Sequence, residues 1–342
     1  MKKRFLSIIL SLSMCLILLP AEVWAADSHD IPELGIGTSS LNPNTYYLIG
    51  EDGSVTTKGA DENEYNIYYD SETRTLTLQN AALTKALYVP YGTTVNLVGV
   101  NQIGTESVQS SVGIQANFDK IDSNEEGGEA DTSITVTGEG SLTIYCNIEG
   151  IYNAKGDIVI HGGKIKITNG SAPIYAEEGG ITIDGSADVT ATSGNGPIFC
   201  KKNLNIGGSA KVTVGGDGIV TALESSNKIV ISGQAVVNAA SSNIAIKGFY
   251  GIEVLDNAKV TATSSRSAAL NSHQGSVVIK GTVDAKSTGS SSAAVDVGQD
   301  EKSTGSVTVT GSLTASGYVG IGDVYKRQGC QRPSKAIRKK SV

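Results

Sequence analysis

The chain of 342 residues carries a formal net charge of −7, but both of its ends are basic. Between them, residues 26–324 hold 17 Lys and Arg residues against 33 Asp and Glu residues, which gives this body a net charge of −16. Nucleic acid and anionic lipid surfaces are negatively charged as well, so the composition argues against both as partners.

Residues 1–25 have the pattern of a secretory signal peptide. A basic start is followed by an apolar run over residues 5–19, and Pro20 then breaks the helix. Val23 and Ala25 occupy positions −3 and −1 of a cut after residue 25. A membrane-spanning helix needs about 20 apolar residues. We therefore expect cleavage, no membrane insertion, and a secreted or cell-surface location.

Residues 26–74 differ in composition and pattern from the rest of the body. Seven of the 13 Tyr residues lie between Tyr46 and Tyr91. This segment predicts an irregular amino-terminal cap, which covers the first exposed edge of the repeats that follow it.

An acidic run spans residues 119–131 and offers a candidate metal site. Its ligands would be the hard oxygens of Asp119, Asp122, Glu125 and Glu126, which suit Ca²⁺. The spacing does not match an EF-hand loop. A solvated insertion that bulges from the surrounding strands is the alternative.

Residues 75–324 are dominated by a repeat of about 24 residues, which predicts three short strands in each unit. Each first strand begins with an inward-facing apolar residue: Ile134, Ile158, Ile181, Leu204, Ile229, Ile252, Val277 and Val307. Each second strand carries an inward-facing pair: Leu142/Ile144, Ile165/Ile167, Val189/Ala191, Val212/Val214, Val237/Ala239, Val260/Ala262, Val283/Ala285 and Leu313/Ala315. Each third strand has one inward-facing anchor: Ile151, Ile174, Ile198, Ile219, Ile246, Leu270, Val295 and Ile321.

Parallel stacking of these units explains the pattern better than hairpins do. Apolar and polar residues alternate over four or five positions, so each strand has one apolar face. One unit cannot bury that face alone, whereas units stacked in register bury a continuous column. An antiparallel sandwich does not require the same side-chain type at the same place in every unit. The sequence therefore predicts an all-β fold, a single-stranded right-handed parallel β-helix.

The residue after each third-strand anchor faces outward, and in three consecutive coils it is aromatic: Tyr152, Tyr175 and Phe199. These side chains would lie about 4.8 Å apart along the stack. Such a ladder could hold successive sugar rings of a polysaccharide. The alternative is a ladder that only stacks on itself and stabilises neighbouring coils.

The cysteines and the carboxyl-terminal tail add two smaller expectations. Cys146 and Cys200 point inward from different faces of the coil, which favours buried thiols over a disulfide. Residues 325–342 are basic and lack the repeat, so this tail is either doubtful sequence or a disordered remnant.

No catalytic constellation is evident in the body. Hydrolases of this fold pair aspartates with a histidine, but His29, His161 and His273 have no acidic partner in such a pattern. Lyases of this fold combine an Asp cluster with a basic residue, and Arg74 and Arg266 lie away from acidic clusters in the sequence. A lysine base is the remaining alternative.

The segment Tyr69–Leu78, followed by coils of the form Gly-x-Ile-x-Ile-x-Gly-Gly-x-Val, resembles exported pectate-lyase-like β-helix proteins of Gram-positive, often gut, bacteria. The resemblance implies a carbohydrate-binding module with calcium sites and affinity for acidic plant polysaccharides. No ligand residue of that family matches a position here.

These observations lead us to expect a non-catalytic β-helix module that binds polysaccharide, with Ca²⁺ as a possible cofactor. The first alternative is a structural stalk or adhesin segment of a larger surface protein. The second is a polysaccharide lyase or hydrolase.

Overall fold

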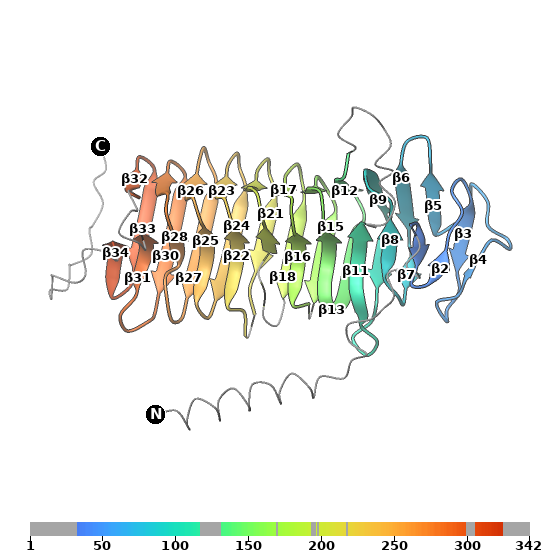
Figure 1. Cartoon of the computed structure of the whole chain (residues 1–342), viewed down its shortest axis with the longest axis horizontal. Coiled ribbons are helices and arrows are strands. Elements are labelled where there is room, and N and C mark those ends of the chain that lie inside the picture. Colours follow the sequence, from blue (N-terminus) through green and yellow to red (C-terminus); the bar gives the residue numbers. More distant parts are fainter. Residues whose placement is uncertain are drawn as a thin grey trace, which may run out of the picture.

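The computed structural model describes residues 33–323, except residues 117–130, 169, 193–195, 197, 217 and 299–304. The elements of this part are β-strands, which stack along the long axis of an elongated rod (Figure 1). Successive strands in each stack are parallel over most of the rod. The predicted parallel β-helix is therefore confirmed. The expected signal peptide and basic tail lie outside the described residues.

Each coil contributes strands to three sheets, named here the first, second and third sheet. The first sheet contains β6 (Thr75–Gln79), β9 (Thr93–Val98), β12 (Ile134–Gly138), β14 (Ile158–Ile160), β17 (Ile181–Ile183), β20 (Leu204–Ile206), β23 (Lys228–Ile231), β26 (Gly251–Val254), β29 (Ser276–Ile279) and β32 (Val307–Val309). The second contains β7 (Ala82–Leu83), β10 (Val100–Ile103), the first part of β13 (Ser141–Asn153), β15 (Lys164–Thr168), β18 (Asp188–Thr192), β21 (Lys211–Val214), β24 (Val236–Ser241), β27 (Lys259–Ser264), β30 (Thr282–Ser287) and β33 (Ser312–Ser316). The third contains β8 (Leu87–Val89), β11 (Ser110–Ala116), the second part of β13, β16 (Ala172–Ala176), β19 (Ile198–Cys200), β22 (Thr221–Ser225), β25 (Ile244–Gly248), β28 (Leu270–Ser272), β31 (Ala293–Val297) and β34 (Val319–Asp323).

The register of the first two sheets follows the sequence repeat. Ile158 pairs with Ile181, which pairs with Leu204. Each of the predicted first-strand residues from Ile134 to Val307 likewise pairs with its counterpart on the next coil. The predicted second-strand pairs are also aligned from coil to coil. Most of these side chains are fully buried in one continuous apolar core. Burial of each large aliphatic side chain stabilises the rod by roughly 1.5–3 kcal/mol.

One predicted anchor of the third strand is wrong. Leu223, not Ile219, pairs with the neighbouring anchors Ile198 and Ile246. The turn before β22 is longer than the corresponding connections of the three coils directly before it and includes Gly218 at φ +92°. This longer turn buries Ile219 at the corner, before the strand begins.

The amino-terminal end is built from antiparallel strands: β1 (Gly35–Ile36), β2 (Ser39–Ser40), β3 (Tyr46–Ile49), β4 (Val55–Thr56) and β5 (Ile67–Asp70). β5 pairs antiparallel with β6, whereas β6 pairs in parallel with β9. The pairing mode therefore changes on β6. Within this end, the rings of Tyr46 on β3 and Tyr68 on β5 stack with centroids 4.3 Å apart.

The last coil is less protected than the others. Val307, Leu313 and Ala315 pack against the core but are only partly buried, and Ile321 is 41% exposed. Side chains at this level have a described neighbouring coil on one side only, which explains their exposure.

Both cysteines of the body are free and buried, as predicted. Burial raises the pKa of the Cys146 thiol to about 12 and that of the Cys200 thiol to about 11.

Among the residues that the structure describes, no helix is long and apolar enough to cross a membrane.

Candidate functional site

The structure brings the three predicted aromatic residues together on the outer face of the third sheet. Tyr152 on β13 pairs with Tyr175 on β16, and Tyr175 pairs with Phe199 on β19. The ring centroids lie 5.6 Å apart for the two tyrosines and 5.4 Å apart for the second pair. The interplanar angles are 34° and 55°, so the rings touch without lying flat on one another. We call these three residues the aromatic ladder.

The strands that carry the ladder are held in register by their inward side chains. Ile151 and Ile174 are fully buried and pair directly. A glycine at position 150 lets the coils approach closely, because a Cβ on Gly150 would lie 2.4 Å from the carbonyl oxygen of Pro173. Side chains on a strand alternate in direction, so burial of Ile151 directs Tyr152 outward.

A hydrogen bond ties the first rung of the ladder to the next coil. The Tyr152 hydroxyl donates to Oε2 of Glu177, which follows β16, over 2.5 Å. Burial, this hydrogen bond and the negative charge of Glu177 raise the pKa of Tyr152. The phenol therefore stays protonated at neutral pH and offers its oxygen and ring as neutral groups.

A second carboxyl group lies near the same rungs. Glu149 is half-buried at the start of the third-sheet part of β13. Burial is the main cause that raises its pKa, and the charge of Glu177 adds to it. The pKa of Tyr175 is raised as well, by burial and then by Glu177 and Glu149. These groups therefore share one electrostatic environment.

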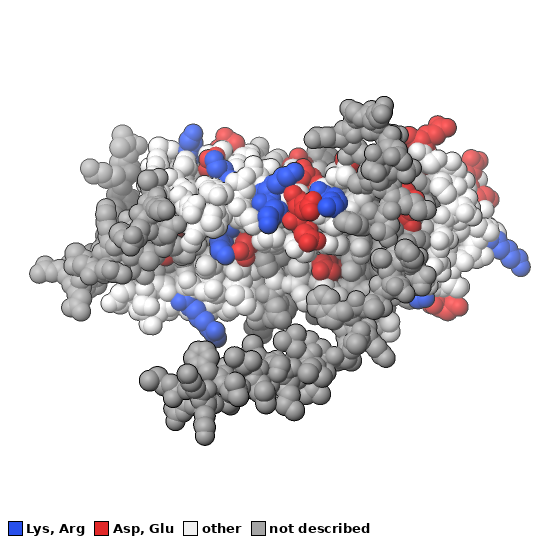
Figure 2. All heavy atoms as spheres, in the orientation of Figure 1, with Lys and Arg blue, Asp and Glu red and all other residues white. Residues whose placement is uncertain are grey.

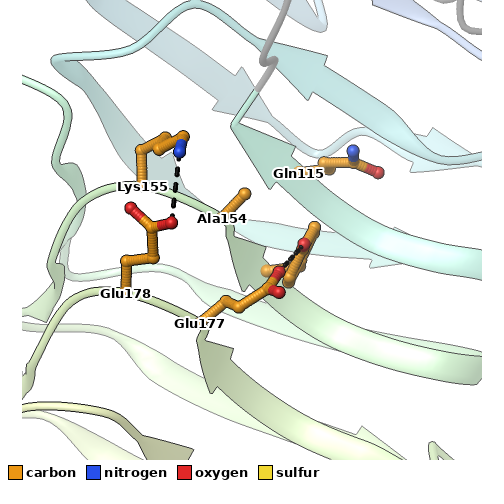
Figure 3. Close-up of a pocket in the computed structure, with 6 residues that line it drawn as sticks. Gln115, Ala154, Lys155, Glu177 and Glu178 are labelled. Carbon is orange, nitrogen blue, oxygen red and sulfur yellow. Dashed lines mark hydrogen bonds and ion pairs between the residues drawn. The ribbon is translucent and has the colours of Figure 1, made fainter.

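A pocket of about 310 Å³ opens beside Tyr152, and Figure 3 shows the side chains around it. Nζ of Lys155 lies 3.1 Å from Oε1 of Glu178, and this ion pair borders one side of the pocket. The lining residues are Gln115, Tyr152, Ala154, Lys155, Glu177 and Glu178. The pocket thus combines one aromatic face with several hydrogen-bonding groups.

The column of outward-facing residues on the third sheet continues along the rod on both sides of the ladder. Gln115 pairs with Tyr152 one coil earlier, and Tyr88 pairs with Gln115. In the other direction, Glu224 pairs with Phe199 on the adjacent coil. Glu224 also forms a 2.7 Å ion pair with Lys247 of the coil after that. Figure 2 shows acidic and basic side chains gathered close together near the middle of the rod.

The Tyr152 hydroxyl donates to the Glu177 carboxylate, and its pKa is raised, so the phenol is neutral in this site. The site presents ring faces, a hydroxyl, an amide and carboxylates, which can contact a polar ligand through both apolar and hydrogen-bonding groups.

The predicted calcium ligands Asp119, Asp122, Glu125 and Glu126 lie outside the described residues. Within the described part of the chain, no group of three or more His, Cys, Asp and Glu residues is arranged to hold a metal ion.

Two basic residues lie close to single acidic groups. His161 has an acidic partner, because its Nδ1 lies 2.6 Å from Oδ1 of Asp184 on the surface next to the first sheet. Arg74 lies close enough to Asp131 for its charge to act on that carboxyl group. Its charge adds to the hydrogen bonds from Ser133 that lower the pKa of Asp131.

Sequence reasoning missed Glu149, Glu177 and the Lys155–Glu178 pair. A signal for Glu177 was present, since it directly follows the strand that carries Tyr175. Residues at the ends of short strands are not constrained by the inside–outside alternation, however, so the repeat did not indicate their directions.

Comparisons with protein-family models, with curated proteins and with solved structures found no match.

Proposed function

We propose that this chain is a secreted or cell-surface module that binds polysaccharide along the outer face of the third sheet, without catalysis. The observation that carries the proposal is the aromatic ladder. Tyr152, Tyr175 and Phe199 lie on consecutive coils with ring centroids 5.4–5.6 Å apart. A hexose in an extended glycan advances by about one strand spacing, so successive sugars would meet successive rings.

The surroundings of the ladder support the same function. Aromatic faces contact the C–H groups of a sugar, and polar groups beside them fix its hydroxyls. Gln115, Glu177 and the Tyr152 hydroxyl provide such groups at the pocket end of the ladder. The ladder is only partly buried, so its rings can be reached from solvent.

Affinity electrophoresis in gels that contain plant or host polysaccharides, with Ca²⁺ present, tests this proposal. We expect a glycan that retards the wild-type protein, and at least about tenfold weaker retardation of Tyr152→Ala/Tyr175→Ala. Tyr318→Ala is the control, because Tyr318 is 60% exposed on the last coil, away from the ladder. The proposal is wrong if no glycan retards the wild-type protein.

A structural stalk or adhesin segment is the second candidate. The contacts between rings of the ladder favour it, since neighbouring aromatic side chains also stabilise adjacent strands. A stalk would lose thermal stability in the double variant, but no glycan would retard either protein.

A further inference from the structure

The pocket at the Tyr152 end of the ladder holds a carboxylate whose charge is not neutralised by its hydrogen-bond partner. Glu178 is paired with Lys155 at 3.1 Å. Glu177 instead accepts a hydrogen bond from the neutral phenol of Tyr152. The charge of Glu177 therefore remains available to a ligand in the pocket.

The charge of Glu177 also acts on three neighbouring titratable groups. Glu149, Tyr152 and Tyr175 all have raised pKa values, with burial as the largest cause, and Glu177 contributes to each shift. Because the charge of Glu177 adds to the raised pKa values of these three groups, further negative charge beside them is disfavoured. The same potential attracts a cation.

Basic side chains also lie close to this region. Lys201 and Lys202 follow β19 at the corner one coil beyond Glu177 and are exposed. The ion pair that borders the pocket joins Lys155 to Glu178. Among the described residues, neither Lys201 nor Lys202 forms an ion pair with Glu177. Exposed lysines are well hydrated, so they screen Glu177 only weakly.

We propose that the glycan recognised by this face carries free amino groups, as in a polymer of de-N-acetylated hexosamine. This inference rests on the proposed function and adds the substrate class. An ammonium group in the pocket would bond to the Glu177 carboxylate and lie beside the ring of Tyr152. Both a charge-assisted hydrogen bond and a cation–π contact would then stabilise it.

The same geometry argues against a polyuronate as the direct ligand. A sugar carboxylate beside Tyr152 would meet Glu177 and Glu149, and the body carries a net charge of −16. The acidic plant polysaccharides implied by the family resemblance would therefore be repelled at this pocket.

Isothermal titration calorimetry with matched hexamers tests the inference. The probes are β-1,4-linked glucosamine hexamer, its fully N-acetylated counterpart and a galacturonate hexamer. A mildly acidic buffer keeps the amino groups of the glucosamine hexamer charged. We expect the wild-type protein to bind the glucosamine hexamer at least about tenfold more tightly than the acetylated one. Glu177→Gln should remove most of that preference.

Asp284→Asn is the matched control, because Asp284 is exposed on the second sheet and the variant makes the same change in net charge. It should keep the preference. Equal losses in Glu177→Gln and Asp284→Asn would overturn the inference, since attraction to the acidic body as a whole would then explain binding. Equal affinity for the two hexosamine hexamers would also overturn it while leaving glycan binding intact. If no hexamer bound, the proposed function itself would fail.

Discussion

Tyr152 and Glu177 are 25 residues apart in the sequence, yet a 2.5 Å hydrogen bond joins them on adjacent coils. This contact links the first ring of the aromatic ladder to the corner of the next coil. The phenol resists ionisation mainly because it is partly buried, and its hydrogen bond to the Glu177 carboxylate raises its pKa further.

Glu177→Gln should lower the pKa of Tyr152 but leave it above the ordinary value for tyrosine. Burial is the largest cause of the shift and would persist in the variant. The ultraviolet difference spectrum of the phenolate during a pH titration measures this, with Tyr152→Phe to identify the signal. An unchanged titration would show that Glu177 does not act on the phenol. In the wild-type protein, stability from this group is present below about pH 10 and is lost as the pH rises further.

Glu149→Gln should stabilise the protein at neutral pH and have little effect at acidic pH. The folded-state pKa of Glu149 is raised, mainly by burial, so the folded state favours the protonated carboxyl. Its contribution to stability is thus present below the ordinary glutamate pKa and is lost as the pH rises through the folded value. The side chain is only half-buried, so we expect less than about 1 kcal/mol. Thermal unfolding at both pH values tests this, and a variant equally stabilised at both would contradict it.

Ile181→Ala should cost about 2–5 kcal/mol of unfolding free energy, because Ile181 is fully buried between identical side-chain positions of the neighbouring coils. Ile321→Ala is the matched comparison on the last coil, where the side chain is 41% exposed. Its cost should be at most about 1 kcal/mol, since less apolar area is lost. Denaturant unfolding of both variants gives the two values. Equal losses would mean that the stacked column does not carry the stability.

Cys146 and Cys200 should resist alkylation in the folded protein and react fully once it is unfolded. Both thiols are buried, and their pKa values of about 12 and about 11 leave almost no thiolate at neutral pH. Peptide mapping by mass spectrometry after iodoacetamide treatment measures each site separately. Rapid labelling of either cysteine under native conditions would contradict its inward position.

Most of the solenoid could be predicted because its physics is periodic. A strand such as Ile181–Ile183 buries every second residue, and the next coil must repeat that pattern to continue the column. The ladder followed from the same alternation. Turns have no such constraint, and the longer turn before β22 moved the anchor from Ile219 to Leu223.

The polar part of the candidate site was less predictable for a related reason. Glu177 lies just beyond a strand, and Glu149 lies where β13 passes from the second sheet to the third. Their neighbours belong to other coils, so the directions of their side chains depend on the corner geometry. Local sequence does not encode that geometry in a repeating form.

Hydroxyl-radical footprinting with and without a bound glycan hexamer tests most directly whether the third-sheet face is the binding surface. The measurement compares the oxidation rates of Tyr152, Tyr175 and Phe199 with that of Tyr318, which is exposed far from the ladder. Ligand that lies on the ladder should slow oxidation of the three ladder rings by at least about twofold and leave Tyr318 unchanged. Saturating glycan that leaves all three ladder rings as reactive as before would contradict the account.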